Sequence, residues 1–172
     1  MDMQREKWKA QWYALYLRSR FEKRVHKDLG GLGIETFLPM IEEIHVWSDR
    51  KKKVMEPLFR GYLFVKTDLR DKETILHTDG VVKFVNIRAQ PSPIPENQIE
   101  WLRRIIGHPA NIKRESYFAE GERVRVTSGP LMGVEGLVLR QQSESRVVIT
   151  LTAIAQSVSV QVPIDLLESI PQ

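Results

Sequence analysis

The sequence lacks cysteine altogether, and it has no long apolar run. Without thiols the chain forms no disulfide and no thiolate metal site, which fits a reducing compartment. No apolar stretch approaches the roughly 18 residues that a membrane-spanning helix needs. The first twelve residues carry charges but no apolar segment, so we expect no signal peptide. These absences predict a cytoplasmic protein without a membrane partner.

The residue patterns that catalysis needs are also missing. The four histidines, at 26, 45, 77 and 108, are scattered, and no two have the spacing of a metal site. Glu42 and Glu43 are neighbours on an expected strand, so their carboxylates point to opposite faces. There is no Gly-x-Ser-x-Gly motif. We therefore expect no enzyme activity, no metal and no cofactor.

Charge is present and unevenly distributed. The net charge is +4, and 28% of the residues are charged. Residues 1–107 carry 20 basic and 15 acidic side chains, a balance of +5, whereas residues 108–172 carry 6 and 7, a balance of −1. A polyanionic partner would meet the first part of the chain, although a well-solvated surface explains the same balance.

The first part of the chain predicts an alternation of strands and helices. The periodicities and the Gly and Pro breakers give strand, helix, strand, strand, helix, strand, helix over residues 12–17, 21–32, 35–47, 53–66, 71–78, 81–87 and 95–107. Ser19 and Glu22 predict a capping box for the first helix. On the last helix Ile99, Leu102 and Ile106 share one face. This order predicts an α+β, ferredoxin-like sandwich.

The second part predicts a small all-β domain. Breakers over residues 108–117 indicate a linker, which gives domains at 1–107 and 118–172. Short β-branched runs, such as Val147–Leu151 and Val158–Val162, predict about five strands, typical of a small barrel. The same runs predict that this domain stays a barrel and does not convert to helix.

The glycine-rich stretch SGPLMGVEGLV, Ser128–Val138, fits neither phosphate-binding template. No lysine follows Gly133 or Gly136 as a P-loop requires, and an apolar run rather than a helix follows Gly136. We interpret the glycines as a turn at Gly129 and as bends in a coiled barrel strand.

Two motifs resemble the NusG family of transcription factors. GERVRVTSGPLMGVEGLV, residues 121–138, looks like the KOW motif of that family. Trp12-Tyr13, EPLFRGYLFV at 56–65, and Gly80-Val81-Val82 followed by Phe84-Val85 resemble its NGN domain. The resemblance covers residues 12–170 and implies an NGN domain followed by an SH3-like KOW barrel, acting in transcription elongation and antitermination.

Two stretches look more like specialised paralogues, the RfaH and UpxY groups, than like the housekeeping factor. These are the same EPLFRGYLFV and, in addition, WSDRKK at residues 47–52. In the KOW turn, Leu131 and Val134 stand where the housekeeping factor usually has aromatics that meet Rho and the ribosome, which leaves both of those contacts open. The resemblance thus implies an operon-specific antitermination factor that works as a monomer.

The resemblance implies two surfaces on the first domain. An apolar pocket that receives the clamp helices of RNA polymerase maps to Tyr16, Glu56, Leu58, Phe59, Tyr62 and Phe64. Aromatic anchors of this kind supply much of an interface's binding energy, although paired strands of a core have the same composition. A cationic helix face that would contact the non-template DNA strand maps to Arg20, Lys23, Arg24 and Lys27.

An alternative function is RNA recognition by the sheet itself. RGYLFVKT, Arg60–Thr67, matches the RNA-stacking signature of RNA-recognition domains except at Leu63 and Thr67. In that case Tyr62 and Phe64 would point away from the sheet and stack on bases. The run of cations at Arg50–Lys53, expected at a hairpin tip, would reach polymerase or nucleic acid, or protect an edge strand from pairing.

Overall fold

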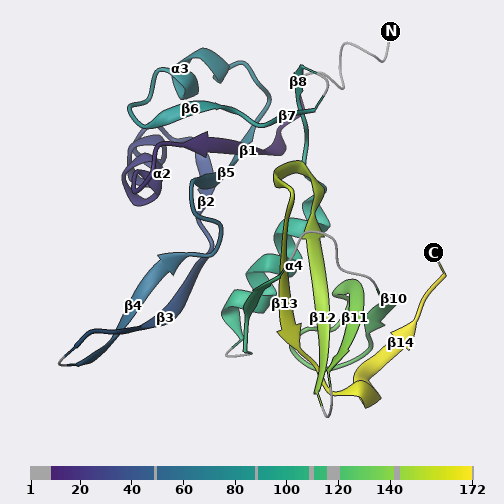
Figure 1. The fold of residues 1–172 in the computed structure, drawn as a ribbon. Coiled ribbons are helices and arrows are strands. Elements are labelled where there is room, and N and C mark those ends of the chain that lie inside the picture. Colours follow the sequence, from purple (N-terminus) through teal and green to yellow (C-terminus); the bar gives the residue numbers. More distant parts are fainter. Residues whose placement is uncertain are drawn as a thin grey trace, which may run out of the picture. The chain divides into compact units, whose positions relative to one another are not determined.

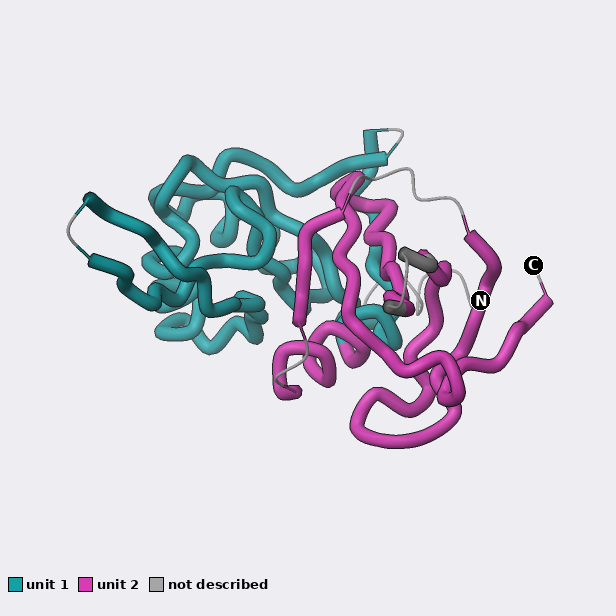
Figure 2. Tube along the Cα trace, turned by 60° about the horizontal axis from the view of Figure 1, so that its bottom comes forward, with its two compact units in different colours: residues 1–99 teal, residues 100–172 magenta. Residues whose placement is uncertain are grey.

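The computed structural model describes residues 9–48, 50–87, 89–108, 111–115, 121–141 and 144–171. The chain divides into two compact units, residues 1–99 and 100–172 (Figure 2). The dividing line falls within helix α4 (Glu96–Gly107) rather than after it. The expected linker at 108–117 contains a short strand, β9 (Lys113–Glu115). The domain limits at 107 and 118 stay a prediction.

The first unit is built on a four-stranded antiparallel sheet (Figure 1). Its order is β2-β5-β1-β6, with β1 at Gln11–Leu17, β2 at Glu35–Phe37, β5 at Tyr62–Thr67 and β6 at Val81–Phe84. Helices α2 (Glu22–Gly31) and α3 (Lys72–Leu76) complete the ferredoxin-like pattern. The predicted fold class is confirmed for this unit.

One face of this sheet forms the core with the two helices. Val25 and Leu29 of α2 and Ile75 of α3 are fully buried with the sheet residues Leu15 and Leu63. The helix residues recur at helical spacing and the strand residues at every second position, so the two periodicities that the sequence shows meet at one interface. This packing fixes α2 across the sheet.

The opposite face carries a second set of aromatic side chains. Pairing of β1 with β5 sets Tyr16 against Tyr62 and Ala14 against Phe64, while β2 sets Phe37 against Phe64. The first turn of α4 lies at one end of this face, because Trp12 Nε1 donates to a Glu96 carboxylate oxygen at 3.1 Å.

Some details of the predicted elements are wrong. The expected strands at 35–47 and 53–66 each divide between two sheets, since β2 and β5 belong to the main sheet, whereas β3 (Met40–Val46) and β4 (Lys51–Pro57) pair in a separate hairpin. Figure 1 shows this hairpin projecting from the ferredoxin-like sheet. In α4 the buried residue is Ile105 rather than Ile106, together with Ile99 and Leu102. A short hairpin of β7 (Asn86–Ile87) and β8 (Gln90–Pro91) follows β6.

The predicted capping box of α2 is also wrong. The residue that precedes α2 is Phe21, and no side chain caps the helix. The Glu22 carboxylate is only 6% exposed and accepts the N–H of Gly61 at 2.7 Å. The Glu22 carboxylate therefore binds the backbone of Gly61, 39 residues away, instead of capping its own helix as the local spacing predicted. The helix does end at the predicted glycines, with Gly33 at φ +75°.

The second unit contains one antiparallel sheet of the order β14-β10-β11-β12-β13-β9. Its strands after β9 are β10 (Glu122–Val126), β11 (Glu135–Gln141), β12 (Glu144–Leu151), β13 (Gln156–Gln161) and β14 (Leu167–Ser169). Two short 3-10 turns, Thr152–Ile154 and Ile164–Leu166, connect the last three. Val124, Val138, Val147, Val158 and Val160 are buried, which gives the strongly curved sheet a core of its own. The predicted small barrel is confirmed.

The glycines of the stretch 128–138 allow a turn and a close approach of two strands. Gly129 and Gly133 have φ of +80° and +84°, which few side chains tolerate. Gly136 lies in β11, where an added Cβ would come within 2.2 Å of the Val148 carbonyl oxygen. Leu131 and Val134, between these glycines, are buried rather than exposed.

None of the helices in the described ranges combines the length and the apolar character needed to cross a bilayer.

Candidate functional site

A groove of about 790 Å³ lies where the sheet, the start of α2 and the β3–β4 hairpin meet. Its walls come from segments far apart in the sequence, and among the lining residues are Tyr16, Arg20, Lys23, His45, Glu56 and Arg60. One wall carries the aromatic ring of Tyr16, and the others are largely charged. Four residues of the predicted polymerase and DNA surfaces therefore line this groove, namely Tyr16, Glu56, Arg20 and Lys23.

Backbone contacts at Gly61 position the aromatic wall. Gly61 has φ +80°, and its N–H is held by Glu22 while its carbonyl accepts the Leu17 N–H at 2.8 Å. The next residue, Tyr62, then lies beside Tyr16 with ring centroids 5.6 Å apart and an interplanar angle of 56°. Tyr16 is 41% exposed and Tyr62 is half-buried. The pair forms an open aromatic surface of the kind that anchors a protein partner.

The remaining apolar residues of the predicted pocket are enclosed. Leu58, Phe59 and Phe64 are each at most 1% exposed. Phe59 packs edge-on against Phe64 at 5.9 Å, and Phe37 stacks on Phe64 at 6.1 Å. These side chains support the surface from beneath, and Tyr16, Tyr62 and Glu56 are the predicted residues that reach solvent.

The pKa of the Tyr62 phenol is raised above its ordinary value of 10.0, first by burial and then by the neighbouring Tyr16. The folded state therefore holds this proton more tightly than the unfolded state. The stability that the neutral phenol supports is present below about pH 10 and is lost as the pH rises through the folded pKa.

We expect an ultraviolet titration of phenolate absorbance to show two late-ionising tyrosines, Tyr62 and Tyr13, because burial raises the pKa of both. In Tyr62→Phe one of these two late transitions should disappear. If the Tyr62→Phe titration matches that of the unmodified protein, the pair does not have the described environment.

A charge network lines the hairpin side of the groove. The Arg60 guanidinium donates to Glu56 at 2.6 Å and to Glu43 at 3.2 Å, and His45 Nε2 lies 2.9 Å from Glu56. Glu43, His45 and Glu56 bring their ligand atoms within 4.8 Å of one another, a set that could hold a cation. Arg60 already neutralises both carboxylates, so the cluster is satisfied by the protein itself. Sequence analysis missed this grouping, although Glu43 and His45 stand two apart on a strand.

The predicted DNA-contacting residues differ in their contacts with the rest of the protein. Arg24 pairs with Asp79 at 3.1 Å and lies over the Phe21 ring, and Lys23 Nζ donates to the Met55 carbonyl at 3.1 Å. Arg20, at φ +67° just before α2, and Lys27 on α2 are exposed. The expected cationic face is present, but Asp79 offsets part of its charge.

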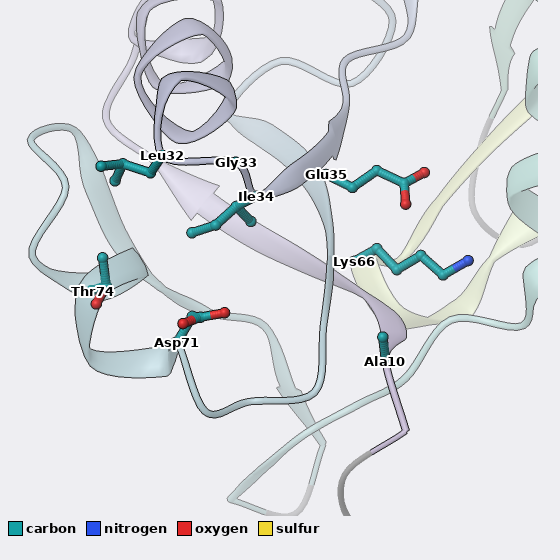
Figure 3. A pocket seen from close by; sticks show the side chains of 8 residues that line it. All are labelled: Ala10, Leu32, Gly33, Ile34, Glu35, Lys66, Asp71 and Thr74. Carbon is teal, nitrogen blue, oxygen red and sulfur yellow. The ribbon is translucent and has the colours of Figure 1, made fainter.

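A second, smaller hollow of about 400 Å³ lies elsewhere in the first unit (Figure 3). Glu35 and Lys66, paired across β2 and β5, stand on one side of it, and Asp71 and Thr74 from the start of α3 stand on the other. Lys66 also pairs with Glu96 at 3.1 Å. None of the predicted site residues lines this hollow.

The architecture and the groove define a class: a ferredoxin-like unit with an aromatic surface, followed by a small β-barrel. The family model for "Transcription termination factor nusG" matches residues 10–103. The chain belongs to the NusG family, whose members are transcription factors that bind RNA polymerase and are not enzymes.

Individual relatives agree with this assignment. The chain is 30% identical over 150 residues to the transcription termination/antitermination protein NusG of Helicobacter pylori J99, covering 78% of this chain and 84% of that one. The NusG of Borreliella burgdorferi is 28% identical over 149 residues, covering 74% and 80%. The solved structure of Thermotoga maritima NusG matches with a TM-score of 0.53 at 24% identity, covering 95% of this chain and 98% of that one, and shows the common fold.

The alternative of an RNA-recognition sheet is not favoured. The family model covers the sheet, and the fold shared with Thermotoga maritima NusG over 95% of this chain includes the barrel that follows it. Phe64, which would have to stack on a base, is 0% exposed. An aromatic enclosed in this way is not available as a stacking platform.

Proposed function

We propose that this NusG-family protein is a specialised antitermination factor that binds RNA polymerase through the groove beside Tyr16 and Tyr62. Family membership supports a general role in transcription termination and antitermination. The observation that supports the binding surface is the open tyrosine pair, held in place by Glu22 and Gly61. A partner helix with an apolar stripe would bury both rings and meet Glu56 and Arg60 at the rim.

The mechanism we infer is bridging across the main channel, which holds the polymerase clamp closed and suppresses pausing in the cytoplasm. Binding on one side uses the tyrosine pair, and the hairpin with its four cations, Arg50–Lys53, would reach a second side. Arg20 and Lys27 would contact phosphates of the non-template DNA strand, with Lys23 and Arg24 beside them. A monomer suffices for this arrangement.

Specialisation is supported by the KOW turn. Leu131 and Val134 replace the aromatics that the resemblance led us to expect, and both are buried. We infer that this protein acts at particular operons rather than on all genes.

In vitro transcription past a pause and a terminator tests the function. With purified core polymerase, we expect the protein to shorten the pause and increase read-through, and we expect a lower effect when salt screens the phosphate contacts. Binding to polymerase is measured separately on the same preparation. Polymerase binding without any change in pausing or read-through would contradict antitermination, and absence of binding would contradict the whole proposal.

A further inference from the structure

The outer edge of strand β13 in the second unit is covered by the short strand β9. β9 pairs with β13 through three residues only, Lys113 to Glu115 opposite Ser159 to Ser157. β13 itself is six residues long, Gln156–Gln161. The β9 sequence Lys-Arg-Glu has no apolar side chain to bury, and Lys113 and Arg114 are exposed. Its attachment therefore depends on backbone pairing and on polar contacts.

Those polar contacts converge on Arg146. This arginine belongs to β12 and crosses β13 with its side chain 2% exposed. Its Nε donates to Ser159 Oγ at 2.8 Å, and its Nη2 donates to the Ser159 carbonyl at 3.2 Å and to the Asn111 carbonyl. The Ser159 hydroxyl in turn donates to Glu115, whose carboxylate lies 3.9 Å from Arg146 Nε.

The buried Arg146 guanidinium needs hydrogen-bond acceptors and a carboxylate, and β9 with the residues before it provides them. A buried guanidinium needs a carboxylate and several acceptors, since removing its partner leaves an uncompensated charge. Arg146 Nη1 has no hydrogen-bond partner within the described part of the chain. The barrel contributes the fixed elements, Arg146 and Ser159, while β9 contributes the Glu115 carboxylate and Asn111, two residues before β9, contributes a carbonyl. Any extended segment with a suitably placed Asp or Glu offers the same groups.

We propose that the β13 edge is a docking site for an extended, acidic segment of a partner protein, which adds as a strand in exchange for β9. Main-chain pairing along Gln156–Gln161 would provide affinity, and the carboxylate on Arg146 would provide specificity, as in other strand-addition complexes. Because β9 is tethered to the barrel, it competes at a high effective concentration, on the order of millimolar. The edge therefore accepts a partner only when β9 is displaced. This site is separate from the polymerase-binding groove and does not depend on it.

The test uses the full-length chain with Lys113→Pro and Arg114→Pro together. Adjacent prolines remove the backbone donors of β9 whichever of the two residues faces β13. The probe is a synthetic peptide of residues 111–117, NIKRESY, and the control peptide NIKRASY replaces the residue corresponding to Glu115 by alanine. Binding is followed by NMR shifts of β13 amides in labelled protein.

We expect NIKRESY to shift the amides of Gln156–Gln161 in the proline variant at concentrations that leave the unmodified protein unchanged. The control peptide should bind about tenfold or more weakly, since a hydrogen bond to a charged group is lost. In Arg146→Met the two peptides should bind with equal affinity. If Arg146→Met does not fold, Ser159→Ala replaces it, and this variant should reduce the difference in affinity between the two peptides.

Three results would overturn the proposal. The first is no shift of β13 amides in a proline variant whose other barrel resonances match the unmodified protein, and the second is equal affinity of the two peptides when Arg146 is present. The third is a dimer of the proline variant in sedimentation, which would assign the edge to a second copy of this chain.

Discussion

Gly136→Ala should unfold or severely loosen the second unit. A Cβ at this position would lie 2.2 Å from the Val148 carbonyl oxygen and 2.9 Å from its carbonyl carbon, closer than atoms approach in proteins. These are backbone atoms of β12, which pairs with β11 next to Gly136, so relief requires separating two strands of the barrel. We expect a loss of about 3 kcal/mol or more in the free energy of unfolding of this unit. Denaturant unfolding followed by NMR of valine methyls reports on the second unit separately.

Gly30→Ala is the matched control for this experiment. Gly30 lies within α2, and an added Cβ would meet nothing within 4 Å. Alanine is the better helix former, so the substitution should stabilise the first unit by about 0.5–1 kcal/mol. If Gly136→Ala, like Gly30→Ala, did not lower the free energy of unfolding, the close crossing of β11 and β12 would be wrong, and with it the reason for the third glycine of the KOW turn.

Alanine at both Tyr16 and Tyr62 should abolish measurable binding to RNA polymerase at concentrations where the unmodified protein saturates. Tyr16 lines the groove and is 41% exposed, and Tyr62 lies half-buried beside it. Truncating an aromatic anchor costs about 2 kcal/mol or more, roughly 30-fold in affinity for each ring. Fluorescence anisotropy of labelled protein with core polymerase measures the affinities of the single and double variants. Loss of pause suppression should follow the loss of binding.

Two further variants separate the surface from its support. Leu32→Ala removes an apolar side chain that is 58% exposed and does not line the groove, so polymerase binding should not change. Phe59→Ala removes a buried ring and should cost about 3–5 kcal/mol of stability, so reduced binding there reports on folding. Normal polymerase binding by a folded Tyr16→Ala, Tyr62→Ala protein would remove this groove as the interface.

Much of the fold could be predicted because residue patterns within each element specify it. The alternation of Leu15 and Leu17, and the spacing of Val25 and Leu29, place apolar side chains on one face whatever the rest of the chain does. The breakers ended α2 at the predicted place, and the β-branched runs identified the barrel strands. The basic residues of α2, Lys23, Arg24 and Lys27, were correctly expected on its exposed side.

The functional surface could be predicted only in part. The sequence grouped Tyr16 with Phe59, Tyr62 and Phe64 as aromatic residues of two adjacent strands, but it could not separate open rings from enclosed ones. That separation depends on the turn before β5, which tucks Phe59 against Phe64 and leaves Tyr62 beside Tyr16. Likewise Arg24 was expected to be available for DNA, and its pairing with Asp79 depends on where the loop before β6 lies.

The sequence by itself determined which elements form, which of their faces are apolar and where glycine is required, because these follow from side-chain periodicity and from backbone sterics within a few residues. Only the tertiary structure decided that Glu22 binds Gly61 rather than capping its helix, that residues 51–57 leave the main sheet for a separate hairpin, and that Arg146 joins β9 to the barrel. Each of these is a choice between partners distant in sequence. A polar group forms its hydrogen bond with whichever partner the packed chain brings within about 3 Å, and the local sequence does not determine which partner that is.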